Sequence, residues 1–173
     1  MSLITRPNLH LNGETIIFTD YHKYLGIFIQ DKKCNLDISR QLRRFHANAK
    51  RLLLKLSKCS DDVKTKLFRS YCTNMYCCQF WTNAALKDLN KLKVAYNNSF
   101  RRLMELSYRC SASGMFVSNK ILSFPELIRK NMWSFIDRLR ASENVLINAI
   151  VNSSVSTFSP IWGNWYHCLT LKT

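Results

Sequence analysis

Residues 35–58 carry the pattern that most constrains how this chain can fold. Apolar residues recur there at alternating intervals of four and three positions, at Ile38, Leu42, Phe45, Ala49, Leu52 and Leu56. This spacing places all six on one face of an α-helix, and such a face has to pack against other elements. We therefore predict a long amphipathic helix over residues 35–58 and a fold of helices that pack around it.

The scarcity of turn-forming residues supports a helical fold. The 173 residues include four glycines and three prolines, whereas 47% of the chain is apolar. A fold with many β-strands needs frequent turn signals, which are missing here. The glycines also lie far apart, and phosphate-cradling loops need several of them close together. We expect a mainly α protein of one domain or two small ones, and we exclude P-loop and Rossmann enzymes.

Two more long helices are predicted after the first. Residues 60–81 begin with Ser60, a favourable N-cap, and with Asp61-Asp62, whose charges suit the positive end of the helix dipole. The buried seam expected for this helix is Val63, Leu67, Tyr71, Met75 and Cys78. Residues 86–106 are predicted to form the next helix, with the inward-facing residues Leu89, Leu92, Tyr96, Phe100 and Leu103.

The C-terminal third is predicted to be helical as well. Residues 110–114 have the composition of a loop. Ser123-Phe-Pro-Glu126 is a capping box that begins a helix through about residue 141, and residues 145–151 form a short last helix. We expect Trp162 and Trp165 to pack in the core.

The N-terminal residues 1–33 indicate β-structure. Asn12-Gly13 is a dipeptide that accepts a positive φ at both turn positions, so it predicts a hairpin between residues 8–11 and 16–18. Residues 24–29 are predicted to form a further strand, because they are aromatic and β-branched. The expected fold is an N-terminal β-hairpin, a helical bundle and further C-terminal helices.

The charge of the chain is its strongest compositional signal. Lys and Arg number 26 against 11 Asp and Glu, which gives a net charge of +15, whereas about 2–8 is usual for a small domain. No acidic residue lies between Arg40 and Cys59. The basic residues predicted opposite the apolar face of the first helix are Arg40, Arg44, Arg51, Lys55 and Lys58. They predict contact with a polyanion, and the plain alternative is a solvated helix face.

The sequence also bears on location. No apolar run approaches the roughly 18 residues of a membrane span, and the first residues lack the apolar segment of a signal peptide. Seven cysteines without a CxxC pair fit reduced thiols. We expect an intracellular protein, nuclear or cytoplasmic and not secreted; attachment to an anionic membrane surface is the weaker alternative for the polyanionic partner.

No pattern predicts a catalytic or metal site. Metal-dependent phosphoryl transfer needs converging carboxylates, and a role at a helix start explains Asp61-Asp62. A zinc site needs about four Cys or His ligands with a short-spaced pair, whereas Cys77-Cys78 and His167-Cys168 are adjacent in the chain. We predict no catalytic residue, no metal ligand and no cofactor in this chain.

Several motifs resemble one protein family when they are taken in order. Tyr24-Leu25-Gly26-Ile27, between a predicted hairpin and a basic helix, resembles a segment of non-LTR (LINE-type) retrotransposon reverse transcriptases. Similar resemblances follow at residues 71–81, 96–103, 110–116 and 124–128. The resemblance covers about residues 8–165, and the ordered series is more specific than any one motif.

The resemblance implies three regions and a role for each. Residues 1–33 would be the primer-grip remnant of a palm, residues 34–108 a thumb-like three-helix region, and residues 109–173 a connecting helical region. Tyr24, Leu25 and Gly26 would lie at the primer backbone. The helix over residues 35–58 would lie along a template–primer duplex of RNA–DNA hybrid, RNA or DNA, held without reading of sequence.

The chain departs from the family at its catalytic motif. It has no aromatic-Ala-Asp-Asp turn, so the resemblance implies a fragment without polymerase activity, whose Mg²⁺ would belong to the missing palm. The function expected is sequence-independent binding of nucleic acid. The alternative is a non-catalytic helical remnant that acts in protein interaction or self-association through exposed apolar surface.

Overall fold

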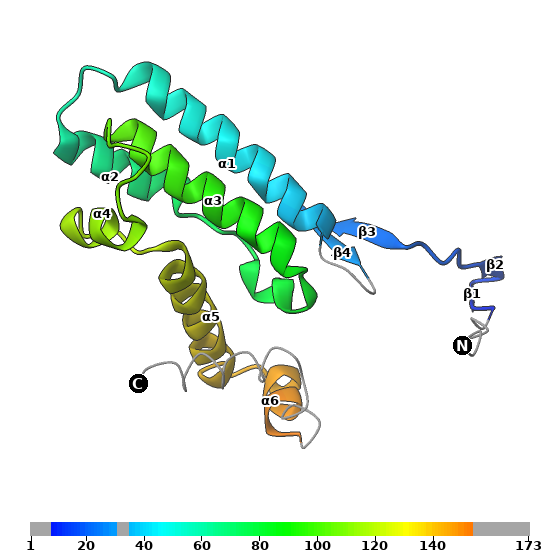
Figure 1. The fold of residues 1–173 in the computed structure, drawn as a ribbon. Helices are drawn as coiled ribbons and strands as arrows, with labels where there is room; N and C mark the ends of the chain where they lie inside the picture. Colours follow the sequence, from blue (N-terminus) through cyan, green and yellow to red (C-terminus); the bar gives the residue numbers. More distant parts are fainter. Residues whose placement is uncertain (1–7, 31–34, 154–173) are drawn as a thin grey trace.

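The protein is mainly helical, with two short hairpins before the helices (Figure 1). The computed structural model describes residues 8–30 and 35–153. The strands are β1 (His10–Leu11), β2 (Glu14–Thr15), β3 (Tyr21–Tyr24) and β4 (Ile27–Gln30). The helices are α1 (Asn35–Lys55), α2 (Asp61–Cys72), the 3₁₀ helix η1 (Cys78–Asn83), α3 (Leu86–Leu103), α4 (Ala112–Ser118), α5 (Phe124–Arg140) and α6 (Val145–Asn152). The expected mainly α fold with an N-terminal hairpin is confirmed.

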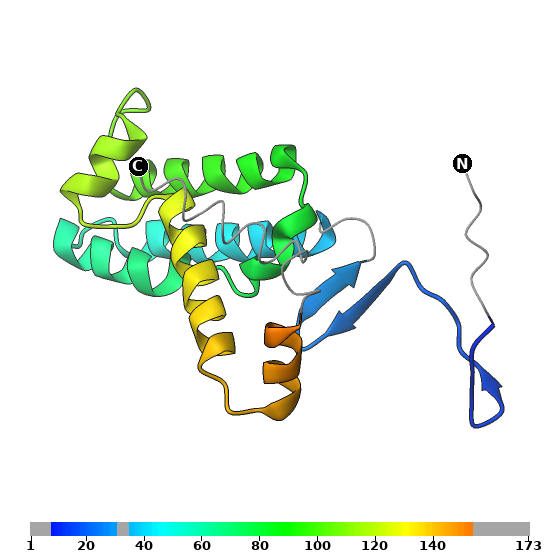
Figure 2. The ribbon, with the colours of Figure 1, turned by 90° about the horizontal axis from the view of Figure 1, so that it is seen from below.

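Helices α1, α2 and α3 form the body of the molecule. Figures 1 and 2 show α1 and α3 side by side and running in the same direction. Helix α2 lies between them in the chain, runs in the opposite direction and packs against both. The apolar face predicted for α1 is confirmed, because Ile38, Phe45, Ala49 and Leu52 are buried. The helix ends at Lys55, three residues before the predicted end.

Aromatic rings fill the centre of the core. Tyr96 is fully buried on α3, and its ring lies 5.3 Å from that of Phe68 and 5.2 Å from that of Phe116, centroid to centroid. Its hydroxyl donates to the Leu122 carbonyl at 2.8 Å, which satisfies the one polar group that a tyrosine brings into a core. The ring cluster therefore joins α2, α3 and α4 and fixes how α4 sits on the body.

The helix predicted over residues 60–81 is too long, and its predicted buried seam holds only at Met75 and Cys78, which lie beyond the end of α2. Helix α2 ends at Cys72, and its buried residues are Lys64, Phe68 and Cys72, whereas Val63 and Tyr71 are exposed. Side chains of α1 satisfy the carbonyls at this break, because Asn48 Nδ2 donates to Tyr71 O at 3.0 Å and Gln41 Nε2 to Asn74 O at 2.7 Å. The chain then turns, with Cys77 at a φ of 60°, into η1.

The N-terminal β-structure differs in part from the prediction. The Asn12-Gly13 turn is confirmed, with Leu11 opposite Glu14 across it, but the return strand is Glu14–Thr15 rather than residues 16–18. The strand predicted over residues 24–29 is confirmed at residues 27–29 but is interrupted before them. Tyr24 pairs with Ile27, so the two residues between them form a second hairpin turn.

The C-terminal helices follow the prediction except at one point. Part of the loop predicted at residues 110–114 belongs to α4, whereas α5 and α6 match their predicted ranges closely. The predicted capping box is present, since the Glu126 carboxylate accepts from the Ser123 backbone N at 2.7 Å and from its hydroxyl at 2.6 Å. The predicted packing of Trp162 and Trp165 lies outside the described residues.

Candidate nucleic-acid interface

One side of α1 presents a row of cations to solvent. These residues, the α1 basic face, are Arg43, Arg44, Lys50, Arg51 and Lys55, and all are exposed. The apolar residues on the other side of α1 pack on α2 and α3, so the packing of the core turns these cations outward. No acidic residue interrupts α1 between Arg43 and Lys55, and none of the five has an ion-pair partner in residues 8–30 and 35–153.

Four of the predicted site residues lie on the α1 basic face or directly after it. Arg44, Arg51 and Lys55 belong to it, and Lys58 is exposed in the turn after α1. Arg43 and Lys50 were missed by the sequence analysis, although they lie on the same exposed side of the helix. Leu54, which is 73% exposed, lies among the cations and adds an apolar contact.

Arg40 is a predicted site residue that does not belong to the α1 basic face. Its side chain is 18% exposed, and its Nε donates to Asp37 Oδ1 at 2.7 Å. Asp37 is nearly fully buried and also accepts from Trp81 Nε1 at 2.8 Å and from the Phe28 backbone N at 3.3 Å. Arg40 therefore serves as the counter-charge of a buried carboxylate that joins β4, α1 and η1.

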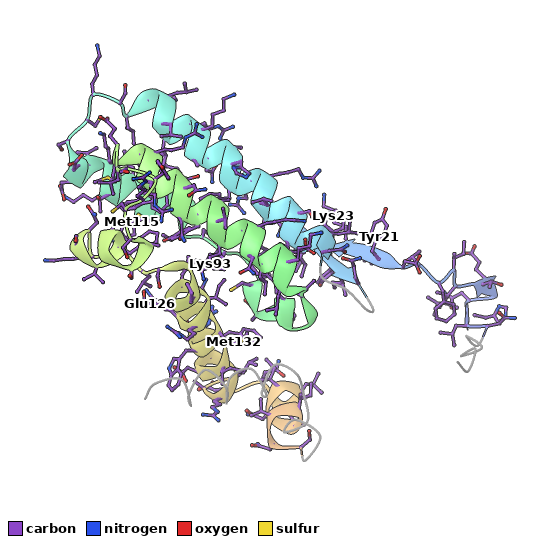
Figure 3. The ribbon with its side chains drawn as sticks, viewed as in Figure 1. Tyr21, Lys23, Lys93, Met115, Glu126 and Met132 are labelled. Carbon is purple, nitrogen blue, oxygen red and sulfur yellow. The ribbon has the colours of Figure 1, made fainter. Side chains whose placement is uncertain are left out.

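Tyr24, Leu25 and Gly26 lie at a hairpin tip rather than within a strand. Leu25 and Gly26 have φ values of 46° and 82°, which fits a tight two-residue turn of the primed type. The side chains of Tyr24 and Leu25 are exposed, so the tip offers an aromatic ring and an apolar group to a partner. Figure 3 shows the neighbouring Tyr21 and Lys23 on β3, at the end of the molecule where α1 begins.

A groove between α1 and α3 adds cations that the sequence analysis did not assign. Its volume is about 840 Å³, and Leu42 and His46 of α1 line it. The residues that line it from α3 are Lys87, Asn90, Lys91, Val94, Ala95, Asn98, Ser99 and Arg102. Their spacing of three and four positions is a helical pattern that could have predicted that these residues share one face of α3. That this face lies beside α1 depends on tertiary packing, which the pattern does not reveal.

Three carboxylates of the body form ion pairs with lysines of α2. Lys64 Nζ lies 3.1 Å from Glu105 Oε1 and 3.7 Å from Asp61 Oδ1, and Lys66 Nζ lies 2.6 Å from Asp62 Oδ2. Among residues 8–30 and 35–153, no group of three or more His, Cys, Asp or Glu side chains could hold a metal ion. Asp61 and Asp62 lie in the first turn of α2, where the sequence analysis placed them.

Burial makes two of the thiols poor nucleophiles. It raises the pKa of the Cys72 thiol to about 12 and that of the Cys78 thiol to about 11. Both thiols stay protonated at neutral pH, and the thiolate is the reactive form. The five cysteines of the described segments are free of disulfides.

Two further findings complete the description of the site. The helices in the described part of the chain include none that is long and apolar enough to cross a membrane. Protein-family models, curated proteins and solved structures give no match to this chain. The interpretation of the site therefore depends on its own chemistry.

Proposed function

We propose that this protein binds nucleic acid without regard to sequence, through the α1 basic face. The observation that supports this most is the row of five exposed cations along one helix with no acidic residue among them. Helix geometry places Arg43 and Lys55 about 18 Å apart along the axis, so the row follows a line as a sugar–phosphate backbone does. Cations that are flexible, exposed and unpaired suit phosphate contacts, which position a duplex but carry no sequence information.

A solvated helix face explains the same residues less well. Solvent-exposed helices commonly mix charges of both signs at i and i+4, and α2 does so with Asp62 and Lys66. The α1 basic face has one sign over three turns. Like charges at this spacing repel one another, so the arrangement destabilises the isolated helix unless a polyanion neutralises it.

The resemblance to a reverse transcriptase thumb supports a duplex as the ligand. In this interpretation the α1 basic face lies along the template–primer duplex, and the tip at Tyr24, Leu25 and Gly26 lies near the primer backbone. The interpretation gives the chain a holding role. Phosphoryl transfer needs converging carboxylates and metal ions, and the proposal assigns no such step to this chain.

The test compares affinities for duplexes of unrelated sequence. We expect similar dissociation constants for RNA–DNA hybrids, DNA duplexes and RNA duplexes of about 20 base pairs at matched salt, measured by fluorescence anisotropy. The α1 variant Arg44→Gln, Arg51→Gln, Lys55→Gln is expected to bind each duplex at least tenfold more weakly, because it loses three phosphate contacts.

A control variant loses as much positive charge as the α1 variant does. The control variant Lys93→Gln, Lys120→Gln, Lys130→Gln also removes three exposed cations, all outside α1. We expect it to bind within about threefold of the wild type. Equal losses in the two variants, or strong binding of one sequence alone, would contradict the proposal.

A second candidate function, self-association, is favoured by α6. This helix has no buried residue, and Val145, Leu146 and Ile150 are 80%, 73% and 67% exposed. Exposed apolar side chains in such a group commonly mark an interface. Size-exclusion chromatography with light scattering separates the two functions, because an oligomer that forms without nucleic acid and dissociates in Leu146→Ser, Ile150→Ser supports the second.

A further inference from the structure

The groove between α1 and α3 has cations near both ends of its α3 side. Lys87, Lys91 and Arg102 line its α3 side and are all exposed, and Asp88, which pairs with Lys91 at 2.8 Å, is the one acidic residue of α3. On the α1 side, His46 lines the groove. Arg43 and Lys50 lie three positions before and four after His46, and therefore share its face of the helix. The cations that line the groove itself all come from α3.

The floor of the groove is made of small and neutral side chains. Ala95 and Ser99 of α3 and Leu42 of α1 line the groove together with the cations of α3. Asn90 and Asn98 add amide groups that can hydrogen-bond to phosphate or sugar oxygens. Among the described residues, no aromatic ring other than that of His46 lines it, and these residues offer no platform on which unpaired bases stack.

The length of the groove exceeds that of a small anion. Lys87 and Arg102 are 15 positions apart on α3, which corresponds to about 22 Å along the helix axis. Successive phosphates of one strand advance about 3.4 Å along a duplex axis. The groove therefore matches about six nucleotides of one strand in length, with Lys87 and Lys91 toward one end and Arg102 at the other.

We propose that the α1–α3 groove holds one sugar–phosphate strand, which runs along the two helices and is gripped through its phosphates by Lys87, Lys91 and Arg102. This inference rests on the proposed function and extends it, because it places one strand on the α3 side of α1. Phosphate contact without base stacking predicts that the strand belongs to a duplex, whose bases face away from the groove. Of the α1 basic face, Arg43 and Lys50 lie nearest to this strand, because they are three and four positions from His46 on α1.

The first test removes the cations of the groove. The groove variant Lys87→Gln, Lys91→Gln, Arg102→Gln should bind an RNA–DNA hybrid of about 20 base pairs at least tenfold more weakly than the wild type. The control variant Lys93→Gln, Lys120→Gln, Lys130→Gln loses the same charge and should bind within about threefold of the wild type. Lys93 is a strict internal control, since it belongs to α3 but lies on the side toward α5 (Figure 3).

The second test needs no variant and so does not depend on folding. Lysine acetylation of the wild-type protein, followed by mass spectrometry, should be slowed at Lys87 and Lys91 by the hybrid and unchanged at Lys120 and Lys130. Equal acetylation of Lys87 and Lys91 with and without the hybrid would overturn the inference.

The outcomes separate this inference from the proposed function. If the α1 variant loses affinity and the groove variant behaves as the control does, the groove inference fails and the proposed function stands. If neither variant loses affinity, both fail. If polyglutamate displaces the hybrid as well as an equal charge of competing nucleic acid does, the groove accepts acidic polypeptides and the assignment to nucleic acid is wrong.

Discussion

Asp37 is the residue that fixes the hairpin to the helical body. Its carboxylate accepts from Phe28 of β4, from Arg40 of α1 and from Trp81 of η1. A buried charge is tolerated when it is paired and its lone pairs are satisfied, as they are here. The spacing of Asp37 and Arg40 is readable from the sequence, but the contributions of Phe28 and Trp81 come from nine and 44 positions away and were not predicted.

We predict that Asp37→Ala destabilises the fold by about 3–5 kcal/mol, because it leaves the Arg40 guanidinium buried without its counter-charge. Urea denaturation followed by circular dichroism measures the change in the free energy of unfolding. Asp88→Ala removes an exposed ion pair and should cost at most about 1 kcal/mol. Equal losses in the two variants would mean that Asp37 contributes no more than a surface charge.

Leu25 adopts a backbone conformation that its side chain disfavours. Its φ of 46° lies in the left-handed region, which costs a residue with a Cβ about 1–2 kcal/mol. Asn is favoured at this position of a primed turn. Leu25→Asn should therefore slow amide hydrogen exchange in β3 and β4, whereas Leu25→Ala, which keeps the Cβ, should not. Faster exchange in Leu25→Asn would indicate that the leucine side chain itself holds the hairpin.

At the scale of single elements, periodic patterns predicted α1 and α3 well. Each has a continuous apolar stripe that neighbouring helices cover, so local and tertiary preferences agree. The end of α2 was missed because no Gly or Pro marks it. It depends on Gln41 and Asn48, which lie on another helix and satisfy carbonyls at the break.

The start of α5 is an element whose stability depends on pH. Hydrogen bonds from the Ser123 side chain and backbone lower the pKa of Glu126 below its usual 4.5. A carboxylate whose pKa is lowered in the folded state stabilises that state above the pKa of the unfolded chain, and this contribution disappears as pH falls through the folded value. The cap is thus intact at neutral pH.

We predict that Glu126→Gln lowers the melting temperature at pH 7 and that the difference from the wild type narrows toward pH 3. Thermal unfolding at several pH values, followed by circular dichroism, measures this difference. A gap that stays constant between pH 7 and pH 3 would show that the ionised carboxylate contributes nothing to the cap.

At the scale of the whole molecule, the two packed helices α1 and α3 concentrate the positive charge. Together they carry eleven Lys or Arg residues and two Asp residues. Both Asp residues are in ion pairs, Asp37 with Arg40 and Asp88 with Lys91. The sequence predicted the row on α1, but the groove arises from the packing of α3 beside it, and no pattern within one helix reveals which helices become neighbours.

The salt dependence of binding tests the central claim most directly, since each phosphate neutralised by a cation adds about −0.9 to the slope of log K against log salt. The measurement compares the wild type with Arg44→Gln, Arg51→Gln, Lys55→Gln on one RNA–DNA hybrid between about 50 and 200 mM salt. We predict that the slope of the variant is shallower by about 3, one unit for each lost contact. Parallel slopes for the two proteins would show that the exposed cations of α1 do not touch the nucleic acid.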